Sequence, residues 1–186
     1  MPDVDKAFIT DMQGVYAQHA QMCSIFNDSI RLLVTVSTLP LVAAGLLIQA
    51  TKQLDFSSIP SVLVWTLLFT PFVVFLIVGI TIQHRFVILF YARALNRYRA
   101  IYSTWAAAAN QPIDLNPMPI DPQYPPNYEP RGQMGLVVHG SAVINGLYLG
   151  FGAYNIGGTV LALLSGLAYL GLMEWWYWFS SHRALP

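Results

Sequence analysis

Two ionisable residues lie inside long apolar stretches of this chain. His139 lies about one to two helical turns inside a stretch at 134–155, and Glu174 lies about as far from the end of a stretch at 158–179. A charged group in such surroundings is costly, so it needs a partner and is a functional candidate by default. A tight turn near Gly157 would place both residues at the same depth of an antiparallel hairpin. We therefore expect a His139–Glu174 pair that shares a proton or a hydrogen bond.

Arginines offer a second kind of chemistry. Arg93, Arg97 and Arg99 lie on a predicted helix at 84–109, where they could bind a phosphate group, an anionic lipid or a nucleotide. The alternative is that their side chains extend to lipid headgroups and set the topology. Arginines nearer the apolar stretches are the alternative partners of Glu174, namely Arg31, Arg85 and Arg131.

Other cofactor and catalytic chemistry has little support. His84 and His139 could hold a b-type haem between two spans, but their predicted depths differ by roughly a turn. No catalytic motif is present, and the single cysteine, Cys23, excludes an internal disulfide and a multi-cysteine zinc site. The net charge of +0 gives no field that would attract a nucleic acid. We expect a protein that is not an enzyme, with no catalytic residues, no cofactor, no metal and no nucleic-acid partner.

Four apolar stretches must position these residues. They lie at 32–50, 60–83, 134–155 and 158–179, and each approaches the roughly 20 residues that a spanning helix needs. They are continuous rather than alternating, which favours helices over barrel strands. The chain is 55% hydrophobic and only 10% charged. The sequence thus predicts an all-α integral membrane protein of one domain, 1–186, with four transmembrane helices arranged as two hairpins.

The distribution of basic residues predicts the orientation. Lys52 is the basic residue of the first predicted outside loop, and the second such loop has none. The opposite side carries Arg31, Arg85, Arg93, Arg97, Arg99, Arg131 and Arg183. Because short cytoplasmic loops are enriched in Lys and Arg, we expect both termini and the central segment to be cytoplasmic. An aromatic run at Trp175–Trp178 would anchor the fourth span at the same interface.

Apolar residues in a predicted amphipathic helix at 5–30 repeat at heptad spacing. One seam position holds Ile9, Tyr16, Cys23 and Ile30, and the other holds Met12, His19 and Phe26. Such a seam predicts packing against a second copy of the helix or against the next cytoplasmic helix of the same chain. The helix at 84–109 presents a stripe for that contact, formed by Phe86, Phe90, Ala94, Arg97, Ile101 and Trp105.

Proline and glycine predict the remaining features. The segment 110–131 is so rich in proline that it should form an extended strap across the cytoplasmic ends of the helices, or else a ligand for a partner groove. Pro40 and Pro71 should kink the first two spans. Small residues in the last two spans predict close helix packing, at Gly146, Gly150, Ala162 and Gly166.

The layout of an amphipathic helix, a two-span hairpin and a long cytoplasmic helix resembles the SLATT-type membrane effector modules of bacteria. The ALNRYRAIY stretch at 94–102, the YPPNYEP strap and two further spans also look like a group of small bacterial polytopic membrane proteins. The resemblance implies a multi-pass protein of the bacterial inner membrane, contacting lipid and forming a homo-oligomer that perturbs the membrane when triggered. The extra pair of spans departs from the two-span SLATT plan. The alternative is a small accessory or scaffold subunit of a larger membrane complex.

Overall fold

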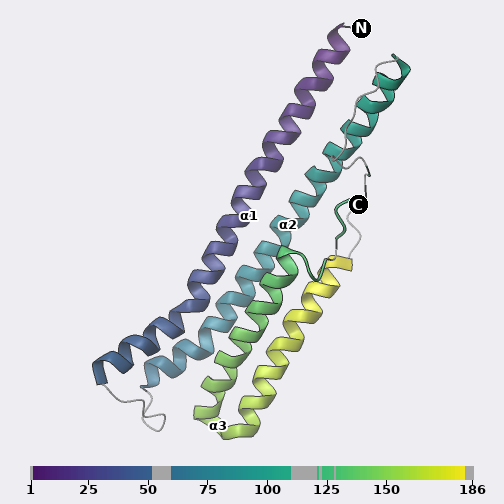
Figure 1. The fold of residues 1–186 in the computed structure, drawn as a ribbon. Helices are drawn as coiled ribbons and strands as arrows, with labels where there is room; N and C mark the ends of the chain where they lie inside the picture. Colours follow the sequence, from purple (N-terminus) through teal and green to yellow (C-terminus); the bar gives the residue numbers. More distant parts are fainter. Residues whose placement is uncertain (1, 52–59, 110–120, 122, 128, 183–186) are drawn as a thin grey trace. The chain divides into compact units, whose positions relative to one another are not determined.

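The computed structural model of this chain is all-α and contains three long helices (Figure 1). They are α1 (Pro2–Thr51), α2 (Ser61–Ala108) and α3 (Gln133–His182). The structure describes residues 2–51, 60–109, 121, 123–127 and 129–182. Each helix is long and apolar enough to cross a membrane. Lys52 and Arg183, two of the basic residues from which the orientation was predicted, lie outside the described residues.

The number of spanning helices differs from the four predicted. The stretches at 134–155 and 158–179 belong to one element, α3, which continues through the predicted turn. Only Gly157 and Gly158 depart from helical backbone angles there, and this break is too short to separate two elements. Gly158 has a φ of 77°, a left-handed conformation that glycine adopts without the cost of a Cβ. The chain reverses at this point, so α3 consists of two arms that Figure 1 draws as a hairpin.

The chain divides into two compact units. One, the extension unit, contains Met1–Asn27 and Gln83–Asn127. The other, the apolar unit, contains Asp28–Ile82 and Tyr128–Pro186. The bounds of α1 and α2 show that each of these helices supplies residues to both units. The predicted helices at 5–30 and 84–109 are therefore continuous with the apolar stretches at 32–50 and 60–83, as parts of α1 and α2.

The core of the apolar unit lies between α2 and both arms of α3. Several of its most deeply buried apolar side chains are small or flexible enough to let helices approach, among them Val74, Val78, Met134, Val138, Ala142 and Met173. Many large apolar side chains of the same helices point outward instead. Val62, Leu147 and Val160 are 75%, 69% and 71% exposed. A surface of this kind is unfavourable in water and suits a lipid environment.

The extension unit pairs the N-terminal part of α1 with the C-terminal part of α2 through a face that differs from the predicted one. Ile9 and Tyr16, predicted to be buried against a helix of the same chain or of a second copy, are exposed in the single chain. Phe8 faces α2 instead, with its ring centroid 5.2 Å from that of Tyr98 and 4.8 Å from that of Trp105. Phe26 is buried as predicted.

The sequence carries two heptad seams on neighbouring faces of α1, and this explains the difference. Both share Met12, His19 and Phe26. The second is completed by Phe8, Val15 and Met22, all of which are half-buried. On α2, likewise, Phe90 and Ile101 of the predicted stripe are exposed, whereas Leu89 and Leu95 are buried. Heptad spacing predicts a packed face but cannot choose between two faces of similar apolarity.

Candidate functional sites

The contact predicted between His139 and Glu174 is present in the apolar unit. Nδ1 of His139 lies 2.6 Å from Oε1 of Glu174, across the two arms of α3. The side chains are 38% and 34% exposed, so the pair lies at the edge of the unit rather than in its core. A contact this short is within hydrogen-bond distance, with the histidine nitrogen able to donate to the carboxylate oxygen. The functional role of this pair stays a prediction.

Tyr177 completes the surroundings of this pair. Its ring is nearly fully buried and lies edge-on to the His139 ring, with centroids 6.4 Å apart. Its hydroxyl donates to the carbonyl of Glu129 at 3.3 Å, just before the start of α3. Val138 and Met173, next to the pair in sequence, are buried. The packed side of the pair is therefore apolar, which strengthens a hydrogen bond between its members.

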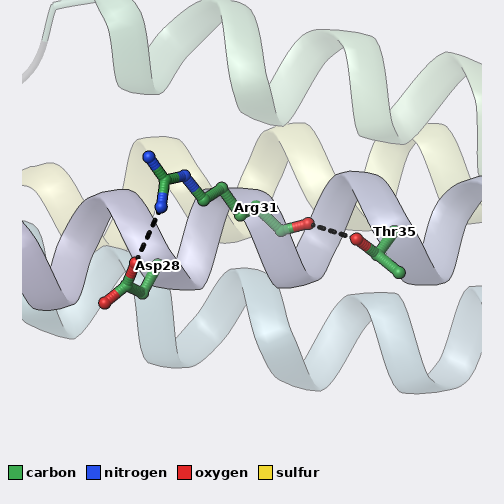
Figure 2. Close-up of polar contacts among 3 residues, drawn as sticks. All are labelled: Asp28, Arg31 and Thr35. Carbon is green, nitrogen blue, oxygen red and sulfur yellow. Dashed lines mark hydrogen bonds and ion pairs between the residues drawn. The ribbon is translucent and has the colours of Figure 1, made fainter.

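The alternative partner Arg31 is engaged elsewhere. Its Nη1 lies 3.5 Å from Oδ1 of Asp28, one helical turn earlier, and both side chains are mostly exposed (Figure 2). An exposed pair of this kind contributes little stability. The hydroxyl of Thr35 donates to the carbonyl of Arg31 at 2.9 Å, so this threonine is satisfied on its own helix (Figure 2). Arg31 is thus a surface cation just before the predicted span.

Two tyrosines of α3 donate hydrogen bonds to the proline turns of the other helices. The Tyr148 hydroxyl donates to the carbonyl of Ser37 at 2.9 Å, three residues before Pro40. The Tyr169 hydroxyl donates to the carbonyl of Pro71 itself, also at 2.9 Å. Proline lacks an N–H, so the carbonyl that loses its intrahelical donor lies four residues earlier, at Val36 for Pro40 and at Leu67 for Pro71. The tyrosines bond to other carbonyls close to the prolines, and these bonds link α3 to α1 and α2. Both prolines were predicted to kink their helices, whereas these tyrosines were not predicted.

Asn145 is a fully buried polar residue near the Tyr148 contact. Its Nδ2 donates to the carbonyl of Ser141 at 3.0 Å and to the hydroxyl of Ser37 at 3.3 Å. Its Oδ1 has no hydrogen-bond partner among the residues that the structure describes. The amide links the first arm of α3 to α1, as polar residues do between helices in lipid.

Small residues allow the two arms of α3 to approach closely. A Cβ added at Gly146 would lie 3.1 Å from the carbonyl oxygen of Gly166, and one added at Gly166 would lie 2.9 Å from that of Gly146. At Gly150 the added Cβ would lie 3.0 Å from the carbonyl oxygen of Ala162. The four predicted packing residues therefore face one another inside the hairpin.

The four aromatic side chains of the run at the end of α3 point to different sides of the helix. Trp175 and Trp178 are exposed, as an interfacial anchor would be. Tyr177 is buried, and Trp176 packs on α2, with its ring centroid 4.2 Å from that of Phe75. The successive residues of a helix point about 100° apart, so a run of four aromatics cannot face one way.

In the extension unit, the proline-rich segment is attached to α2 through two polar side chains. Nη2 of Arg93 donates to the carbonyl of Pro125 at 2.8 Å and to Oδ1 of Asn127 at 2.6 Å. Nδ2 of the buried Asn96 donates to the carbonyls of Asp121 and Tyr124 at 3.0 and 2.9 Å. The described part of this segment thus lies along α2. Residues 110–120, 122 and 128 lie outside the described residues.

The three arginines proposed as anion contacts have different surroundings. Arg93 is committed to the proline-rich segment, and Arg97 is exposed. Arg99 is half-buried and donates from Nη1 to Oδ1 of Asn96 at 3.1 Å. Within the described parts of the chain, no carboxylate forms an ion pair with any of the three. Arg99 is therefore the arginine best placed to bind an anion in an enclosed site.

His19 faces Arg99 from α1. Burial, and secondarily the positive charge of Arg99, lower the pKa of His19 below its usual value of 6.5. Its ring lies 3.9 Å from the thiol of Cys23, whose own pKa is raised by burial. Both residues precede the predicted span at 32–50. His19 is therefore predominantly neutral at neutral pH and can donate a hydrogen bond from one ring nitrogen.

Over the described ranges, no three His, Cys, Asp or Glu side chains are grouped so that they could hold a metal ion. Nδ1 of His139 is taken by Glu174, so only its Nε2 could serve as a haem ligand. No known protein family, curated protein or solved structure matches this chain. Its function is therefore argued from its own residues.

Proposed function

We propose that this chain is a multi-pass membrane protein in which each arm of α3 crosses the bilayer once, so that four crossings leave both termini in the cytoplasm. The arginine distribution and the exposed apolar surface of the apolar unit support this topology. The reversal at Gly157 and Gly158 supports a hairpin, because each arm of α3 has roughly the 20 residues that a crossing needs.

The polar side chains of the apolar unit are compatible with lipid, because many are satisfied on their own helix. The hydroxyls of Thr35, Thr66 and Thr81 each donate to the carbonyl four residues earlier. Asn155 does the same with its amide, toward the carbonyl of Phe151. Such local bonds lower the cost of a hydroxyl or amide in a hydrophobic environment.

We further propose that the protein is a homo-oligomeric membrane effector or channel-like protein, gated through the extension unit. The observation that carries this proposal is that part of the heptad seam of α1 is left uncovered by the residues that the structure describes. Ile9 and Tyr16 lie on this seam and are 46% and 61% exposed. An apolar seam outside the spans is unfavourable in water unless a further surface covers it. A second copy of the same seam supplies a matching surface.

The connection between the units supports gating. α1 and α2 run without interruption from the extension unit into the apolar unit. A change in the packing of the extension unit would therefore reach the spans through continuous helical backbone. Val74, Val78 and Val138 fill the interior of the apolar unit, which fits a protein that does not conduct until it is triggered.

The second candidate is an accessory or scaffold subunit of a larger membrane complex. The observation in its favour is the large exposed aromatic surface of the apolar unit, which includes Trp65, Phe69 and Phe72 on α2. Such a surface suits contact with a different subunit as well as with lipid. The two candidates predict different particles after extraction in mild detergent. A homo-oligomer contains several copies of this chain, whereas an accessory subunit is found with a different protein.

Disulfide crosslinking distinguishes them. In a Cys23→Ser background, Ile9→Cys should form a disulfide-linked dimer under mild oxidation in native membranes. Gln21→Cys, exposed on the opposite side of the same helix from the seam, is the control and should crosslink much less. Equal crosslinking of both variants, or of neither, would reject the shared seam. A particle containing one copy of this chain with a different protein would favour the accessory subunit.

A further inference from the structure

A pocket of about 200 Å³ lies within the extension unit, where three segments of the chain meet. Its lining comes from α1 (Tyr16 and His19), from α2 (Ala92, Leu95, Asn96 and Arg99) and from the proline-rich segment (Tyr124 and Pro125). We propose that this pocket binds an anion of the phosphate class through the guanidinium of Arg99. The ligand is a soluble phosphate or the phosphate of a lipid headgroup, which share this chemistry.

The charge of the pocket supports an anion. Arg99 is its cation, and no carboxylate is among the lining residues. Among the described residues, Arg99 makes one hydrogen bond, from Nη1 to Asn96. Since a guanidinium has five N–H donors, most of them remain available for a ligand. Arginine binds phosphate through paired, charge-assisted hydrogen bonds, and this geometry leaves room for one.

The other polar groups of the pocket are suited to the same ligand. His19 can donate from a ring nitrogen, and the hydroxyls of Tyr16 and Tyr124 can donate as well. The wall formed by Tyr124 and Pro125 is held in place, because Asn96 and Arg93 bond to the backbone carbonyls of these two residues. A site whose walls are already fixed loses little entropy when the ligand binds.

Size limits the ligand to a small group. Pockets for drug-sized molecules usually have volumes of about 300–1,000 Å³, so a pocket of about 200 Å³ is below that range. A single phosphate or phosphate monoester group suits the available space better than a large organic anion. This assignment does not rest on the oligomeric function proposed above: Tyr16 belongs to both the seam and the pocket lining, but Ile9, which tests that function, does not line the pocket, and Arg99, which tests the pocket, does not lie on the seam.

Calorimetric titration of the purified full chain with inorganic phosphate tests the proposal. The protein is held in neutral detergent at constant ionic strength, so that a non-specific salt effect does not register. We expect the wild type to bind phosphate saturably. The affinity of Arg99→Gln for phosphate should be lower by a factor of about ten or more, because a hydrogen bond to a charged group is lost. Arg97→Gln is the matched control, since Arg97 lies two residues away, is exposed and does not line the pocket.

Arg99→Lys guards against a purely structural effect, because Arg99 also contacts Asn96. This variant keeps the charge and should bind phosphate more tightly than Arg99→Gln, with a similar melting temperature. Nanodiscs then identify the source of the ligand. The phosphate affinity is measured in phosphatidylglycerol nanodiscs and in phosphatidylcholine nanodiscs. Equal affinities indicate that the ligand is a soluble phosphate. A weaker apparent affinity in phosphatidylglycerol indicates that the lipid headgroup competes for the site. Absence of binding by the wild type, or equal losses in Arg97→Gln and Arg99→Gln, would overturn the proposal.

Discussion

His139 and Glu174 meet across the α3 hairpin, with Nδ1 of the histidine 2.6 Å from Oε1 of the glutamate although 35 positions separate them in sequence. This contact satisfies both ionisable groups within one element and links the two arms near their open end. An ionisable group in lipid requires such a partner. The pair therefore stabilises the hairpin whether or not it also has a role in function.

A double-mutant cycle should show that these two residues are coupled. We expect Glu174→Gln and His139→Asn each to lower the free energy of unfolding by about 1 kcal/mol, a modest value because both side chains are about one-third exposed. The double variant should lose less than the sum of the single losses. Reversible denaturation in mixed micelles measures the three values, and additive losses would show that the residues do not interact.

Residue depth made the His139–Glu174 contact predictable from sequence, because both residues are similarly distant from a glycine turn. The partner face of α1 was less predictable, since its two heptad seams share Met12, His19 and Phe26 and differ only in the residues between them. The contacts of Arg93 and Asn96 with the proline-rich segment were also beyond sequence reasoning. Apart from the bond of Arg93 to Oδ1 of Asn127, they are made to backbone carbonyls, which leave no trace in residue type.

The number of helices shows a similar limit. The four apolar stretches fall in three helices, because the stretches at 134–155 and 158–179 both belong to α3, in which Gly157 and Gly158 form a two-residue break. Apolar length predicts where a chain can cross a membrane. It does not predict whether neighbouring stretches are separated by a loop or by a reversal within one helix.

The tyrosine contacts at the proline turns should contribute to stability. Tyr148→Phe or Tyr169→Phe removes a hydrogen bond that links α3 to a backbone carbonyl of α1 or α2. We expect each change to cost roughly 1 kcal/mol of unfolding free energy. Tyr154→Phe is the control, because this tyrosine is exposed on the same helix. A similar melting temperature for all three variants would contradict the role assigned to these hydroxyls.

Close packing of the α3 arms should make Gly166 intolerant of a side chain. The Cβ of Gly166→Ala would lie 2.9 Å from the carbonyl oxygen of Gly146, so the arms must separate. We expect a loss of about 1–3 kcal/mol. Gly171→Ala, on the same arm, meets nothing within 4 Å and should be neutral or slightly stabilising. The prediction fails if both substitutions shift the thermal unfolding midpoint equally.

Anion binding in the extension unit should strengthen as pH falls. His19 is predominantly neutral at neutral pH because burial and Arg99 lower its pKa, whereas a bound anion favours the imidazolium. Binding therefore takes up a proton, and affinity rises as pH falls through the usual histidine range. Tyr16 and Cys23 on α1, Arg99 on α2 and Tyr124 on the proline-rich segment are the other titratable or charged groups facing this site.

Titration with sulfate, whose charge is constant over this range, measures the effect. The wild type should bind sulfate more tightly at pH 5.5 than at pH 7.5, and His19→Gln should show a much flatter dependence. If the sulfate affinity of His19→Gln depended on pH as steeply as that of the wild type, the proton taken up on binding would belong to another group.

Cysteine accessibility in intact cells tests the membrane topology, on which the account as a whole depends. Single cysteines are introduced at Ser57, Ile156, Gln123 and Ala184 in a Cys23→Ser background and treated with a membrane-impermeant maleimide. Four crossings with cytoplasmic termini predict labelling at Ser57 and Ile156 in intact cells, and at Gln123 and Ala184 only after permeabilisation. Labelling of Ala184 in intact cells, or protection of Ile156, would contradict the double crossing of α3, and labelling of Gln123 in intact cells would contradict the cytoplasmic position of the extension unit.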